Sequence, residues 1–200
     1  TNLTSGGDVQ LSPILDMLAV RYLIFRGAPD PRTHTAFQGP DYWVLVNPDA
    51  MPRAYIPRQV EMVADNATRL RKLASSEFDP RDVAYLESPV DLSAPGQGTV
   101  DIVEEIPTRV TLSFRAETRS LVVLADLWDK GWRAYLNGQR VPVLRANHAL
   151  RGVVVPAWFQ LWGGLSAASG FASLIGAVQG ALLSVVVLFV LGWLSRGMTR

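Results

Sequence analysis

The chain contains no cysteine and only two histidines, and no charged side chain occurs between Gly152 and Ser195. The lack of cysteine excludes a disulfide framework, a thiolate nucleophile and a cysteine-ligated zinc site. His34 and His148 stand far apart, and neither belongs to a spacing in which two histidines hold one metal ion. We therefore expect no metal site and no cofactor.

Several catalytic signatures are also missing. The sequence has no Gly-x-Ser-x-Gly, no P-loop and no Gly-x-Gly-x-x-Gly pattern, so nucleophile-elbow hydrolases and nucleotide-binding enzymes have no support. The 19 basic and 18 acidic residues give a formal net charge of +1. Without a clustered basic face, we expect no binding to nucleic acid.

The uncharged C-terminal stretch is long enough to cross a bilayer. Residues 171–194 contain Gln179 as the only strongly polar side chain, and a helix of this length reaches about 36 Å, against about 30 Å of hydrocarbon. Arg196 and Arg200 follow the segment, which favours a cytoplasmic C-terminus. We predict one transmembrane helix over 171–194 and a cytoplasmic tail over 195–200. The alternative is a very apolar core helix of a soluble domain.

Two further features favour a packed membrane protein. Small residues recur every fourth position along the predicted span and form one ridge suited to packing against other transmembrane helices: Ala172, Gly176, Gly180 and Ser184. Residues 158–170 include Trp158, Phe159 and Trp162, which suit an interfacial linker. Residues 153–168 are alternatively a re-entrant or second short hydrophobic element.

The first half of the chain, residues 1–98, predicts a mixed α/β part. Ser12-Pro13 opens a helix, and Asp65 or Asn66 caps a second, from about Ala67 to Ala74. A loop rich in Gly, Pro, Asp and Thr covers 27–41. Strands are expected at Val20–Phe25, Tyr42–Val46, Ala54–Val63 and Asp82–Leu86.

From Thr99 to Ala157 the pattern predicts strands alone. Leu121 to Ala125 is continuously apolar, as expected of a strand buried on both faces. Asn137-Gly138 lies between two strand-like runs and predicts a two-residue hairpin, and a second reversal is expected near Asn147. The fold class is mainly β with an α/β elaboration, a β-sandwich followed by one transmembrane α-helix.

The turn before this hairpin carries the candidate ligand-binding residues. Trp128 and Tyr135 are the better exposed aromatic candidates for stacking on a sugar ring, whereas Trp132 shares a strand face with aliphatic residues and is expected in the core. Asp129 joins them as a carbohydrate-binding candidate. With Asp126 it forms either a carboxylate pair of the kind glycosidases use or the polar cap of a tight turn.

Two arginines are candidates for a different ligand. Arg53 and Arg58 stand beside Pro52 and Pro57, and either would suit a lipid phosphate near the membrane. The commoner outcome for such residues is a surface salt bridge.

The hairpin region also resembles a known family. Gly131-Trp132, Ala134, Asn137-Gly138 and the later Pro156-Ala157 resemble the extracytoplasmic β-sandwich of the YfhO-type bacterial membrane proteins, multispan proteins similar to GT-C glycosyltransferases. Shorter stretches starting at Leu18, Asn47 and Phe78 agree in the same order, so the resemblance covers about residues 13–157. After Ala157 the family's glycine, histidine and final alternating strand are replaced by Trp-Phe-Gln-Leu-Trp-Gly-Gly. We expect that last strand to be missing or replaced.

The resemblance implies a C-terminal portion of a bacterial cell-membrane protein, with its main domain extracytoplasmic. Such a portion would position or bind a lipid-linked sugar or an acceptor glycan in cell-envelope polysaccharide or teichoic-acid-type glycosylation. GT-C enzymes usually carry their catalytic carboxylate in an early loop that this chain lacks, so we expect no catalytic residue. Thr1 is followed by no signal-peptide core, which agrees with a fragment of a longer protein. The alternatives are a membrane-tethered carbohydrate-binding or scaffold domain, or a tethered glycosidase using Asp126 and Asp129.

Overall fold

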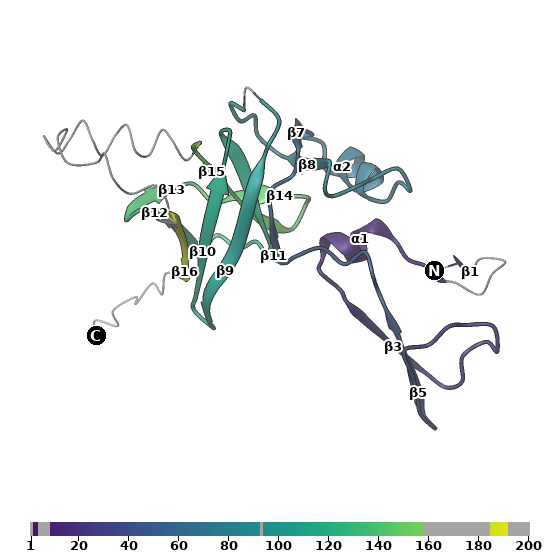
Figure 1. The fold of residues 1–200 in the computed structure, drawn as a ribbon. Coiled ribbons are helices and arrows are strands. Elements are labelled where there is room, and N and C mark those ends of the chain that lie inside the picture. Colours follow the sequence, from purple (N-terminus) through teal and green to yellow (C-terminus); the bar gives the residue numbers. More distant parts are fainter. Residues whose placement is uncertain (1, 4–8, 93, 158–184, 192–200) are drawn as a thin grey trace, which may run out of the picture.

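The computed structural model describes residues 2–3, 9–92, 94–157 and 185–191 (Figure 1). This part of the chain is mainly β, as predicted, and two large sheets pack face to face as a sandwich. Two short strands, β1 (Asn2–Leu3) and β2 (Val9–Gln10), pair with each other near the N-terminus.

The larger sheet has six strands in the order β6-β11-β15-β14-β8-β7. Adjacent strands in this sheet are antiparallel, except for β7 and β8, which are parallel. Its strands are β6 (Ala54–Tyr55), β7 (Gln59–Met62), β8 (Val83–Leu86), β11 (Ser120–Leu127), β14 (Leu144–Ala146) and β15 (Leu150–Val155). Parts of the chain before and after residue 98 therefore contribute to one sheet.

The six-stranded sheet is strongly curled. Its two edge strands, β6 and β7, follow one another in sequence and are joined by residues 56–58 alone. A linker of that length reaches at most about 14 Å, so the edges must approach each other. One strand was predicted over Ala54–Val63, and this is wrong: Pro57 has no N–H to donate to a ladder and lies between two separate strands.

The smaller sheet has five strands in the order β13-β12-β16-β10-β9, and every pair is antiparallel. Its strands are β9 (Gly98–Ile106), β10 (Arg109–Ala116), β12 (Trp132–Leu136), β13 (Gln139–Val141) and β16 (Val185–Leu191). Asn137 and Gly138 have φ values of 49° and 81°, which is the backbone of the predicted two-residue turn between β12 and β13.

Two hydrophobic cores lie on opposite faces of the six-stranded sheet. Val122 and Leu124 of β11 face the five-stranded sheet and pack with residues of β10, β12 and β15. Leu121 and Val123 point the other way and pack with Leu73 and Met17 of the two helices. The prediction that this apolar run is buried on both faces is confirmed.

β16 corrects the predicted transmembrane helix. Val185–Leu191 lies between β10 and β12 and pairs with both, so a helix over 171–194 is wrong for these seven residues. The sequence Val-Val-Val-Leu-Phe-Val-Leu is rich in strand-forming side chains, and pairing satisfies its backbone groups between two partner strands. The rest of the predicted span and its four ridge positions, Ala172, Gly176, Gly180 and Ser184, lie outside the described residues. Within the described residues, no helix is long and apolar enough to cross a bilayer.

The helices are short and capped as expected. α1 (Pro13–Met17) starts after Ser12, whose side chain accepts from the Ile14 N–H at 3.4 Å. α2 (Asn66–Leu73) starts after Asp65, which accepts from the Thr68 N–H at 2.7 Å. Both helices contribute to the core on the outer side of the six-stranded sheet.

A third sheet stands apart from the sandwich in Figure 1. It contains β3 (Tyr22–Arg26), β5 (Tyr42–Val46) and β4 (Phe37–Gln38), in the order β3-β5-β4. The short strand β4 lies within the predicted 27–41 loop. Phe25 and Trp43 stack across β3 and β5 with their ring centroids 4.3 Å apart.

Candidate functional site

A pocket of about 550 Å³ opens where the chain crosses twice between the two large sheets. The first crossing leads from β11 to β12, and the second leads from β13 to β14. The two connections lie side by side because both attach to the open end of the β12–β13 hairpin. The residues lining the pocket are Trp128, Asp129, Lys130, Trp132, Arg133, Arg140, Val141, Pro142 and Val143.

Asp129 shapes the first crossing. Its Oδ1 accepts from the Gly131 N–H at 2.7 Å, and its carbonyl accepts from the Trp132 N–H at 3.2 Å. This is an Asx turn, in which an aspartate side chain replaces a backbone acceptor. Asp129 therefore performs the turn-capping role while its exposed side chain also lines the pocket.

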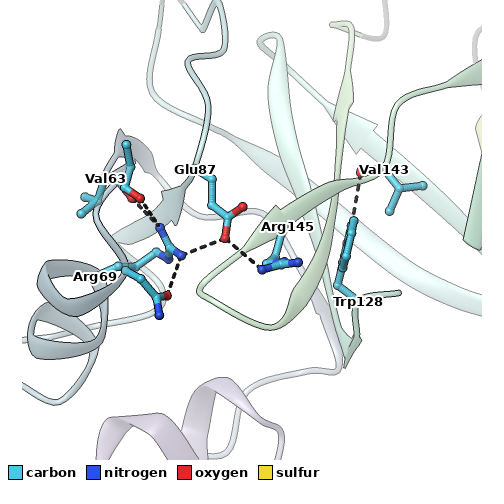
Figure 2. Close-up of polar contacts among 8 residues, drawn as sticks. Val63, Arg69, Glu87, Trp128, Val143 and Arg145 are labelled. Carbon is cyan, nitrogen blue, oxygen red and sulfur yellow. Dashed lines mark hydrogen bonds and ion pairs between the residues drawn. The ribbon is translucent and has the colours of Figure 1, made fainter. Parts of the chain in front are cut away.

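Three contacts hold Trp128 in place. Its backbone N–H donates to the Ala149 carbonyl at 2.6 Å, and its indole Nε1–H donates to the Val143 carbonyl at 3.3 Å. The guanidinium of Arg145 lies over the ring, with its central carbon 4.3 Å from the ring centroid. These contacts fix the orientation of the half-buried indole at the pocket wall (Figure 2).

Arg145 is in turn connected to the helical side of the molecule. Its Nη1 lies 3.2 Å from Glu87 Oε1, and the same oxygen lies 2.8 Å from Nη2 of Arg69 in α2. The Arg69 side chain is only 2% exposed and also donates to the Val63 carbonyl at 2.6 Å. Figure 2 shows this series of contacts from α2 through Glu87 to the Trp128 ring.

Trp132 also packs against an arginine guanidinium. The Arg151 guanidinium carbon lies 3.5 Å from the Trp132 ring centroid, and the half-buried indole packs against the core between the sheets. Arg151 donates from Nε to the Leu127 carbonyl at 3.0 Å, and its Nη1 lies 3.3 Å from Asp126 Oδ2. Burial lowers the pKa of the Arg151 guanidinium, and the charge of Asp126 opposes that shift. Trp132 thus serves both the core and the pocket wall.

Asp126 does not face the pocket as a free carboxylate. Arg53 binds it with two hydrogen bonds, Nε to Oδ1 at 2.7 Å and Nη2 to Oδ2 at 2.9 Å. The hydrogen bonds to Asp126 raise the pKa of Arg53, and Glu105 adds a further contact at 2.7 Å. Asp126 therefore lies between two cations, Arg53 and Arg151. Asp129 is left as the one carboxylate among the described residues that line the pocket.

The remaining predicted residues lie elsewhere. Arg53 is engaged by Asp126 and Glu105, and Arg58 forms an exposed pair with Asp82 at 2.9 Å, so both make the salt bridges expected in the alternative interpretation. Tyr135 is half-buried on β12, opposite Arg140 of β13, and does not line the pocket. The structure therefore brings together Trp128 and Asp129, but not Tyr135.

Three cations of the pocket were not predicted as site residues. Lys130, Arg133 and Arg140 come from the turn, β12 and β13 respectively. Their signal in the sequence was weak: they flank the Gly-Trp motif and the Asn-Gly turn, but only the pairing of β12 with β13 places them around one pocket.

Within the described part of the chain, no three histidine, aspartate or glutamate side chains gather as a metal site. His148 lies in the turn between β14 and β15 with a φ of 73°, beside Asn147 at 46°, and this turn is the second reversal expected from the sequence. Comparisons with protein families, curated proteins and solved structures find no match for this chain.

Proposed function

We propose that this chain is a non-catalytic glycan-binding domain, and that the pocket between Trp128 and Trp132 holds a sugar of a lipid-linked donor or an acceptor glycan. The observation that carries the proposal is two indoles lining one pocket, each fixed from behind by an arginine. Indole rings supply large apolar contact areas for the C–H face of a sugar, and surrounding polar groups orient its hydroxyls.

The carboxylates support binding without hydrolysis. Glycosidases use two carboxyl groups on opposite sides of the scissile bond. Here Asp126 is bound by Arg53 and Arg151, while Asp129 caps the turn through the Gly131 N–H. This arrangement disfavours the tethered glycosidase that uses Asp126 and Asp129.

We also propose that the domain acts at the bacterial cell envelope, outside the cytoplasm and against the membrane. The support is the uncharged sequence of residues 156–184, between β15 and β16, and the resemblance of residues 13–157 to YfhO-type proteins. With Val185–Leu191 in the sheet, we propose contact with the bilayer surface in place of a span over 171–194. A cytoplasmic C-terminus depended on that span, so we no longer propose it.

The test is a titration of the whole chain with neutral oligosaccharides, maltotriose and chitotriose, followed by the indole N–H signals in NMR spectra. Binding in the pocket would shift the signals of Trp128 and Trp132 and leave that of Trp43, in the separate sheet, unchanged. Trp128→Ala should weaken binding about tenfold, in line with stacking contributions of about 0.5–1.5 kcal/mol. Trp43→Ala is the matched control.

A second candidate function is a scaffold domain without ligand. It would be favoured if no saccharide, neutral or charged, shifts the Trp128 and Trp132 signals. That result would overturn the glycan-binding proposal.

A further inference from the structure

The pocket contains three cations without an acidic partner. Within the described residues, Lys130, Arg133 and Arg140 form no ion pair within 4 Å. Elsewhere in the fold acidic partners are common, and the arginines that have one include Arg53, Arg58, Arg69, Arg81, Arg109, Arg145 and Arg151. These three unpaired cations line one pocket, whereas other described arginines without an ion pair, such as Arg21, Arg26 and Arg119, do not line it.

The three cations converge from different elements. Lys130 comes from the β11–β12 turn, Arg133 from β12 and Arg140 from β13. Arg133 is partly fixed, because its Nη1 donates to the Lys130 carbonyl at 2.7 Å and to the Trp132 carbonyl at 3.0 Å. Its Nε and Nη2 form no hydrogen bond with any described residue, so one side of the guanidinium fork remains available to a ligand.

The one carboxylate of the lining does not cancel this charge. Asp129 uses Oδ1 to accept from the Gly131 N–H, and three cations against one carboxylate leave an excess of two positive charges. A phosphomonoester carries about −1.5 to −2 near pH 7, and a carboxylate carries −1.

The arginines behind the indoles favour the same class of ligand. A cation over one face of an aromatic ring draws on the negative charge of its π system. With Arg145 over Trp128 and Arg151 over Trp132, both rings are less attractive to a cationic ligand and more tolerant of anionic oxygens.

We infer that the pocket selects sugars carrying an oxyanion, a phosphate or a carboxylate, over neutral sugars, with Arg133 and Arg140 as the residues that determine this specificity. The inference rests on the proposed glycan-binding function of the same pocket and names its ligand class. The indoles hold the sugar ring, and the guanidinium groups hold the charged substituent.

The experiment compares glucose, glucose 1-phosphate and glucuronate on the whole chain by calorimetry and NMR titration, with inorganic phosphate as a fourth probe. At least one anionic sugar should bind about tenfold more tightly than glucose, and its affinity should fall as salt is raised. The phosphate and carboxylate sugars identify which oxyanion the site takes.

Variants assign the effect to the pocket. Arg140→Gln and Arg133→Gln should each reduce the affinity for the anionic sugar about fivefold more than they reduce the affinity for glucose. Arg119→Gln is the matched control, because Arg119 is exposed in the turn before β11, at the opposite end of that strand from the pocket.

The outcomes separate the two proposals. Equal affinity for all three sugars, or a preference unaffected by both arginine variants, overturns the oxyanion inference and leaves the glycan-binding proposal standing. Binding of inorganic phosphate that Arg140→Gln abolishes, without binding of any sugar, supports an anion site and overturns the glycan-binding proposal. No signal shift with any of the four probes overturns both.

Discussion

Arg145 lies between Glu87 and Trp128: its guanidinium carbon is 4.3 Å from the indole centroid, and its Nη1 is 3.2 Å from Glu87 Oε1. The same carboxylate oxygen binds the buried Arg69 of α2 at 2.8 Å. Glu87 Oε1 therefore links α2 to Arg145, and Arg145 packs on Trp128 at the pocket wall. Arg145 contacts the ring, Glu87 contacts Arg145, and neither lines the pocket, so both act as positioning residues.

Glu87→Gln tests this relationship. The substitution removes the charge shared by Arg69 and Arg145, and we expect the free energy of unfolding to fall by about 1–3 kcal/mol, as for other hydrogen bonds to charged groups. The Trp128 indole N–H signal should broaden or shift, and saccharide binding should weaken. The measurements are urea unfolding and NMR.

Glu77→Gln is the control for that variant. Glu77 is exposed after α2, and among the described residues no hydrogen bond or ion pair of its side chain occurs, so its substitution should leave both stability and the Trp128 signal unchanged. If Glu87→Gln also leaves the Trp128 signal unchanged, Arg145 keeps its place without Glu87 and the positioning role is wrong.

Asp126→Asn addresses the second arginine–tryptophan pair. Asp126 balances Arg53 and Arg151, and the Arg151 side chain is only 6% exposed. Removing one partner of a buried ion pair leaves a buried charge uncompensated, so we expect a loss of about 3 kcal/mol in unfolding free energy. Asp101→Asn, on the exposed side of β9, is the control and should cost almost nothing. Equal stability of the two variants would contradict the role assigned to Asp126.

The parts of this fold that the sequence predicts well depend on local signals. Asn137-Gly138 determines its own turn, and Ser12 and Asp65 cap the helices that begin beside them. The run from Leu121 identifies a strand buried on both faces. In each case the deciding residues are neighbours in the sequence.

The errors come from partners distant in the sequence. The apolar run containing Val185–Leu191 suits a membrane helix or a buried strand equally well. The pairing with β10 and β12 decides between them, and no local pattern reveals it. Likewise, Trp128 and Asp129 were found from the turn, but Arg145 and Arg151 reach the two indoles from later strands.

Acid should weaken the start of α2 through Asp65. Hydrogen bonds from the Thr68 side chain and backbone lower the pKa of Asp65 below its usual 3.8. A depressed folded-state pKa means that the carboxylate stabilises the fold above the unfolded-state value and loses that contribution as the pH falls through the folded-state value. We therefore expect Asp65→Asn, which keeps a neutral cap, to show a shallower loss of stability below about pH 4.

The measurement is thermal unfolding of both proteins from pH 7 down to pH 2.5. Asp91→Asn is the matched control, since Asp91 is exposed and caps neither α1 nor α2. If the unfolding temperature of Asp65→Asn falls with pH in the same way as that of the unmodified chain, Asp65 does not contribute to the acid sensitivity.

Leu188→Pro tests whether β16 belongs to the sandwich. Leu188 lies opposite Thr111 of β10 and Tyr135 of β12, in the centre of the five-stranded sheet. Proline has no N–H to donate and fits poorly in a central strand, so the variant should lose about 3 kcal/mol or more of unfolding free energy. Leu188→Ala keeps the N–H and isolates the backbone effect from the loss of the side chain. In a bilayer helix separate from the sandwich, proline at this position would leave the unfolding of the β-rich part unchanged. A proline variant as stable as the alanine variant would therefore contradict the pairing of Val185–Leu191 with β10 and β12. The segment would then fit a membrane helix better than a strand of the sandwich.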